Sequence, residues 1–155
     1  MLPPDAAGFH RGATMPAAPG DGRAVAYATD GLQAAGALVE LTVPSEPGAL
    51  EGADSPAAQA ALDRMLAEVT HPGVSRTMHE QARFLLPARG EPPVLRCVET
   101  AGRYGREQVE GLLCAGILRG ALLRLRVTMP RLDPPAADPH AFARAILAVL
   151  RSSPS

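Results

Sequence analysis

The segment ALLRLRVTM, residues 121–129, decides the fold because apolar and polar side chains alternate along most of its length. Leu123, Leu125 and Val127 would point to one face of a sheet, and the two arginines between them would point to the other face. A period of two is typical of a strand that buries one of its faces. We therefore expect residues 121–129 to form a strand that lines the protein core.

Further alternation and turn signals extend the sheet toward the N-terminus. Residues 37–43 alternate in the same way, and Asp30-Gly31 is a typical hairpin turn before them. Strands that follow one another through short turns pair in antiparallel fashion. Besides residues 121–129, the expected strands are residues 8–15, 23–29, 37–43, 77–86, 94–100 and 112–118.

Residues 77–86 fit both a strand and a helix. As a strand they place Met78, Ala82, Phe84 and Leu86 on one face, and as a helix they group two of these with a neighbouring leucine. We favour the strand, because a proline and a glycine directly after this segment supply a turn into the next strand.

One amphipathic helix is expected after each group of strands. Ser55 precedes a proline, and Asp138 precedes another; this pair of residue types is typical of a helix start. Apolar residues then recur at steps of three and four, which gives each helix one apolar stripe. His71-Pro72-Gly73 ends the first helix.

These elements predict an α+β fold. We expect a single antiparallel sheet of about six to seven strands with two helices packed on it, in the order βββ-α-ββββ-α. The length of 155 residues suits one domain, so residues 1–155 are expected to form it. Residues 1–7 and 152–155 are expected to be flexible tails.

Composition excludes several classes of protein. The 15 basic residues are all arginine and are balanced by 16 acidic residues, which leaves a net charge of −1. Nucleic-acid-binding proteins normally carry a basic excess, so no nucleic-acid partner is expected. A P-loop is excluded because the chain has no lysine. No apolar run reaches about 18 residues, so no membrane span is expected.

Motifs for catalysis and metal binding are not found in the sequence. His79-Glu80 begins like the zinc-peptidase motif, but Arg83 stands where the second histidine is required. A nucleophile built from Cys114 and His79 is disfavoured, because Cys114 is surrounded by aliphatic residues. We therefore expect no catalytic residues, no metal and no cofactor, and we favour a non-enzymatic protein over an enzyme.

The two cysteines, Cys97 and Cys114, lie on the arms of a hairpin expected to turn around residues 102–106. This position would allow them to meet, but we favour two small apolar core residues with free thiols. The N-terminus lacks the basic and apolar regions of a secretory signal, so the chain as written is expected to be cytoplasmic. An exported form whose leader has been removed is the alternative.

An arginine row is the candidate ligand-binding feature. Arg124 and Arg126 share one side of their strand, and Arg96 lies inside a neighbouring strand. Three guanidinium groups on one face would bind a carboxylate or a phosphate. The alternative, which we favour, is an exposed sheet face on which these arginines pair with glutamates of adjacent strands.

The order of elements resembles that of PsbP-like proteins of the α/β/α-sandwich type. The segment LLRLRVTMP, residues 122–130, is similar to the last strand of small bacterial proteins of this kind, and GFHRG, residues 8–12, followed by AVAY, residues 24–27, is similar to their opening strand pair. The resemblance implies a non-enzymatic accessory role, and it carries over no functional residues.

The sequence thus favours a small non-catalytic binding or accessory protein that engages a protein partner through a sheet face or a sheet edge. Homodimerisation is a natural mode, because an exposed edge accepts a further strand. One alternative is a small-ligand-binding protein or an enzyme that acts on an anionic substrate through Arg96, Arg124 and Arg126. Another is an immunity protein, an inhibitor or a secretion chaperone.

Overall fold

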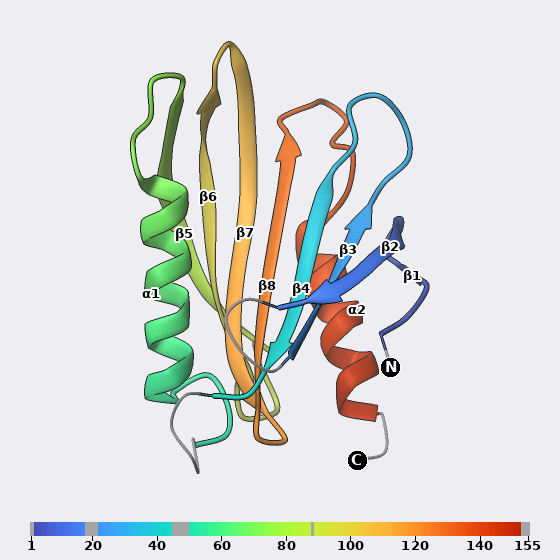
Figure 1. Cartoon of the computed structure of the whole chain (residues 1–155), viewed down its shortest axis with the longest axis vertical. Helices are drawn as coiled ribbons and strands as arrows, with labels where there is room; N and C mark the ends of the chain where they lie inside the picture. Colours follow the sequence, from blue (N-terminus) through green and yellow to red (C-terminus); the bar gives the residue numbers. More distant parts are fainter. Residues whose placement is uncertain (1, 18–21, 45–49, 88, 153–155) are drawn as a thin grey trace.

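The computed structural model describes residues 2–17, 22–44, 50–87 and 89–152, and it places eight strands in one antiparallel sheet with two helices. Figure 1 shows the sheet as a twisted and curled layer. The strands are β1 (Asp5–Ala6), β2 (Phe9–Pro16), β3 (Gly22–Ala28), β4 (Gly36–Thr42), β5 (Arg76–Leu86), β6 (Leu95–Tyr104), β7 (Glu107–Leu118) and β8 (Ala121–Pro130). The helices are α1 (Pro56–Thr70) and α2 (Pro139–Ser152).

The sheet consists of two meanders joined at one seam. Its strand order is β1-β2-β3-β4-β8-β7-β6-β5, so the last strand of the chain pairs with β4 in the middle of the sheet. Helix α1 connects β4 to β5, and therefore carries the chain from the middle of the sheet to its far edge. The outermost strands are β1, with two residues, and β5, with eleven.

The prediction of about six to seven strands is wrong, because the sheet has eight. The observed order is ββββ-α-ββββ-α, which is still an α+β fold. The additional strand is β1, which pairs only Asp5 with His10 and Ala6 with Phe9. Two residues are too few to produce an alternating pattern in a sequence.

The two faces of the sheet carry different hydrophobic clusters. On the α2 face, Leu112, Cys114 and Leu125 pack in the cluster that contains Phe142 and Ile146 of α2. On the α1 face, the alternate residues Val98, Leu113 and Ala115 pack against Leu62 and Met65 of α1. The expected core strand behaves as predicted, because Leu123, Leu125 and Val127 are all buried.

The segment 77–86 is a strand, but the face predicted for it is wrong in part. A bulge at Gln81 interrupts the register of β5 against β6 between Glu80 and Ala82. The extra residue reverses the alternation. Met78 therefore lies on the α1 face, whereas Ala82, Phe84 and Leu86 lie on the α2 face.

The cysteines are not free thiols. Cys97 of β6 and Cys114 of β7 are directly opposite each other and form a disulfide, with a Cα–Cα distance of 4.1 Å. The hairpin that joins these strands turns at Gly105-Arg106, within the range expected. Both cysteines are fully buried on the α2 face, so this bond is part of the core.

The ends of the chain lie on the sheet as far as they are described. Leu2 and Ala6, within the range expected to be a flexible tail, are buried. Of the C-terminal tail expected at residues 152–155, residues 153–155 lie outside the described residues.

His10 of β2 also ties the N-terminal strand to the sheet. It contacts Asp5 of β1 at 2.6 Å and Asp30 of the β3–β4 loop at 3.2 Å, and these carboxylates raise the pKa of His10.

The helices begin where the sequence predicts. Asp138 caps α2, because its carboxylate accepts a hydrogen bond of 3.1 Å from the backbone N–H of Ala141. Ser55 occupies the cap position of α1 but makes no side-chain cap hydrogen bond. Among the described residues, neither helix is both long and apolar enough to cross a membrane.

Candidate binding site

The predicted arginine row lies on one face of the sheet, but its members are held apart. Arg96 and Arg124 occupy one row across the strands, with Ala115 between them, and helix α1 packs over Ala115. Arg96 binds Asp54 at 3.2 Å and the Ala53 carbonyl at 3.1 Å. Arg124 likewise has a carboxylate partner of its own. Because each arginine of this row is already paired with a separate carboxylate, the row does not form a shared site for an anion.

Arg124 and Arg126 each have an acidic partner. Arg124 contacts Glu40, its cross-strand neighbour on β4, at 2.9 Å. The side chains of this pair are only 15 % and 18 % exposed. Arg126 contacts Glu68 of α1 at 3.2 Å, and this pair is much more exposed. The pair of Arg124 with Glu40 is of the kind expected from the sequence, an arginine with a glutamate of an adjacent strand.

A different group of charges lies on the α2 face, beyond the start of α2. A hollow of about 400 Å³, which we call the cationic hollow, is lined by His79, Arg103, Gln108 and Arg131 among others. Arg103 is directly opposite Gln108, and the Gln108 carbonyl accepts a 2.9 Å hydrogen bond from the Arg131 N–H. The two arginines therefore flank one glutamine in a single row across the sheet.

The floor of the cationic hollow is Ala101. In the next row, Ala101 pairs with His79 on β5 and with Glu110 on β7. A single methyl group between longer side chains leaves a depression in the sheet face. A second hollow of about 290 Å³ adjoins this one and shares Ala101 and Arg131 with it, and it adds Glu110 and Glu99 to the lining.

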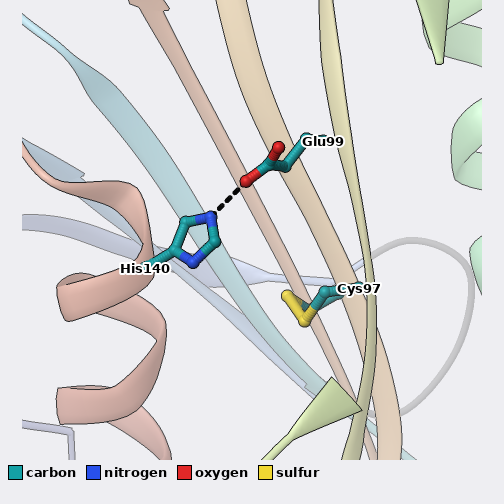
Figure 2. The surroundings of a disulfide bond; sticks show 4 residues. Cys97, Glu99 and His140 are labelled. Carbon is teal, nitrogen blue, oxygen red and sulfur yellow. Dashed lines mark hydrogen bonds and ion pairs between the residues drawn. A yellow bond between two sulfur atoms is a disulfide. The ribbon is translucent and has the colours of Figure 1, made fainter. Parts of the chain in front are cut away.

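His140 and Glu99 form the wall of the second hollow. The His140 Nε2 atom contacts a Glu99 carboxylate oxygen, as Figure 2 shows, and the imidazole stacks on Phe84 with 4.4 Å between ring centroids. Glu99 follows Cys97 on the same face of β6, so the disulfide lies in the next row of that face, near this pair. A histidine at the start of α2 is thus held against two strands of the sheet, β5 through Phe84 and β6 through Glu99.

The outer edge of β5 borders the cationic hollow. Most of its residues are exposed, and Leu85 is 37 % exposed. Between Met78 and Leu85, no described residue donates to or accepts from the backbone on this outer side. Arg83 binds Glu80 at 2.6 Å on the α1 face, and this hydrogen bond lowers the pKa of the Glu80 carboxyl.

The chemistry available here is recognition by charge and hydrogen bonds. Among the described residues, no three histidine, cysteine or acidic side chains lie close enough to bind a metal ion. His79 and Cys114 are not brought together, because Cys114 is disulfide-bonded in the core. The hollows instead present arginine, histidine, glutamine and glutamate side chains.

Sequence reasoning missed Arg103 and Arg131 because both lie just beyond the ends predicted for their strands, at Thr100 and Met129. Residue parity would have placed Arg103 on the face of Cys97, had the hairpin been extended to Tyr104. Comparison of the chain with protein-family models, with curated proteins and with solved structures finds no match. A proposal about function therefore depends on the geometry alone.

Proposed function

We propose that this chain is a small non-catalytic binding protein that engages a protein partner through the outer edge of β5, and that this partner is a second copy of the chain. The observation that supports the proposal is the eleven-residue edge strand whose outer backbone groups have no partner among the described residues between Met78 and Leu85. Unpaired backbone groups of this kind accept an added strand.

The direction of the backbone groups on β5 follows from the disulfide pair. A Cα–Cα distance of 4.1 Å between Cys97 and Cys114 is that of a non-hydrogen-bonded pair. The backbone of Cys97 therefore bonds toward β5, where its partner is Phe84. It follows that the residues on either side of Phe84, Arg83 and Leu85, direct their N–H and C=O groups outward.

On the other side of the bulge, Met78 and Glu80 are the residues whose backbone N–H and C=O groups point away from β6. All four outward residues carry their side chains on the α1 face, in the order apolar, acidic, basic, apolar. An antiparallel second copy centred on the bulge places Met78 opposite Leu85 and Glu80 opposite Arg83. Opposite charges and apolar pairs directly across two strands are stabilising.

The bulge makes this register specific. In a regular strand, Glu80 and Arg83 would lie on opposite faces, and a pairing centred between them would not match. The residue inserted at Gln81 returns both side chains to one face. Bulges and charges ordinarily protect a sheet edge against indiscriminate pairing. Here they favour the register in which the two bulges are opposite each other and each Glu80 is opposite an Arg83.

Light scattering during size-exclusion chromatography tests the proposal over a concentration series. Dimers are expected for the wild type, and Arg83→Pro is expected to be monomeric, because proline removes an outward donor without breaking the pairing to β6. Arg83→Ala is the matched control for loss of the side chain. A wild type that is monomeric at high micromolar concentration overturns the proposal.

Charge reversal tests the register itself. Glu80→Arg places two arginines opposite each other at both ends of the bulge and should weaken the dimer. The double variant Glu80→Arg/Arg83→Glu restores the complementary order and should recover it. Equal dimerisation of the single and double variants contradicts this register, while circular dichroism confirms that both variants fold.

We further propose that the protein works in an oxidising compartment. The support for this is the pairing of Cys97 and Cys114 in the core, since structural disulfides persist where thiols are not kept reduced. Alkylation of thiols in extracts of the native host, followed by mass spectrometry, tests this proposal. Two alkylated cysteines in the freshly trapped protein would place it in a reducing compartment.

A further inference from the structure

Three of the charged side chains that line the two hollows differ from the ion-paired arginines elsewhere on the sheet. Arg83, Arg96, Arg124 and Arg126 each contact a carboxylate. In contrast, the side chains of Arg103, Arg131 and Glu110 make no ion pair or hydrogen bond within the described part of the chain. Three charged groups around one depression are thus left to the solvent or to a ligand.

The positive and the negative charges of this group lie at different positions along the strands. The row of Arg103, Gln108 and Arg131 forms the cationic end, and no acidic side chain among the described residues lines that hollow. Glu110 lies two residues from Gln108 on the same face of β7, which corresponds to about 7 Å along a strand. The other nearby carboxylate, Glu99, already has His140 as its partner.

We propose that the joined hollows bind a small zwitterion, with its carboxylate on Arg103 and Arg131 and its ammonium group on Glu110. Two guanidinium groups that flank one position suit a carboxylate, since each donates a charge-assisted hydrogen bond. An anion alone would leave Glu110 unpaired, and a cation alone would leave both arginines unpaired. A volume of about 400 Å³ lies within the range of small-molecule sites.

The scaffold around the site is fixed before a ligand arrives. Ala101 keeps the floor open, and the stacked His140 holds Glu99 in place so that Glu110 is the carboxylate left for the ligand. The disulfide between β6 and β7 fixes the two strands that carry Arg103 and Glu110. This binding site does not depend on the pairing of β5 with a second copy.

Isothermal titration calorimetry with three probes of equal chain length tests the inference. The probes are ε-aminocaproate, which carries both charges at the ends of its chain; caproate, which carries the anion only; and hexylamine, which carries the cation only. The wild type is expected to bind ε-aminocaproate about tenfold more tightly than either single-charge probe. Tighter binding of phosphoethanolamine would retain the zwitterion site and identify the anion as phosphate.

Two variants assign the ends of the ligand. Arg131→Gln should reduce the affinity for ε-aminocaproate toward that for hexylamine, because Arg103 alone then holds the carboxylate, and Glu110→Gln should reduce it to that for caproate. Arg144→Gln, which changes an exposed arginine on α2 outside both hollows, is the matched control and should change nothing. The inference is overturned if ε-aminocaproate produces no heat of binding, or if all three variants respond alike.

Discussion

Removal of the disulfide between Cys97 and Cys114 should lower the stability of the protein by a predictable amount. The two cysteines are separated by 17 positions in the sequence, so the bond closes a loop of that size in the unfolded chain. The chain-entropy relation for such a loop gives about 3 kcal/mol at room temperature. For a chain of 155 residues, this corresponds to a decrease in melting temperature of about 6–12 °C.

The measurement compares urea unfolding of the wild type and of Cys97→Ala/Cys114→Ala, each with and without reductant. Reductant should lower the unfolding free energy of the wild type by about 3 kcal/mol and should leave the double variant unchanged. Alanine is the appropriate replacement, because serine would bury a hydroxyl group in an apolar cluster. If reductant leaves the unfolding midpoint of the oxidised wild type unchanged, the loop-closure reasoning is refuted.

Three further perturbations follow from contacts described above. Glu40→Gln should lower the free energy of unfolding in urea by about 1–3 kcal/mol, because it leaves the largely buried Arg124 guanidinium without its counter-charge. Glu68→Gln, at the exposed pair with Arg126, is the control and should lower it by less than about 1 kcal/mol. Gly102→Ala should destabilise the protein by about 1–3 kcal/mol, because its Cβ would overlap the backbone carbonyl oxygen of Thr77 on β5. Gly36→Ala, whose Cβ meets no atom within 4 Å, is the control. His10→Gln removes a histidine whose pKa is raised in the folded state, so the stabilisation by His10 is complete below its ordinary pKa of 6.5 and is lost as pH rises through the raised value. The difference in melting temperature between wild type and His10→Gln should therefore shrink with rising pH, and a difference that grows would contradict this account.

Periodicity predicted the elements whose side chains face a continuous core. The alternation in residues 121–129 identified β8, and the cap residue Asp138 identified the start of α2, because both signals are local. The same reasoning placed Met78 on the wrong face, since a bulge depends on the pairing of two strands and leaves no mark on the periodicity of one. The short strand β1 was missed because it depends on contacts with β2.

The candidate site was less accessible to sequence reasoning. Arg103 and Arg131 come together only when the hairpin from β6 to β7 is extended beyond its apolar part and when β8 is placed beside it. The disulfide depends on the same register, because Cys97 and Cys114 are opposite only for one turn position. Long-range register of this kind is fixed by all the strands together and not by any single segment.

The seam between β4 and β8 imposes an order on biosynthesis. When β4 leaves the ribosome, β3 is already available as one neighbour, but β8, the neighbour on its other side, has not been translated, because β8 follows β5, β6 and β7 in the sequence. The inner side of β4 thus remains an open template throughout the synthesis of β5, β6 and β7, and pairings between distant segments form slowly. The nascent chain is therefore most exposed to aggregation in the interval before β8 emerges, and a chaperone that shields Leu38 to Thr42 would act in that interval.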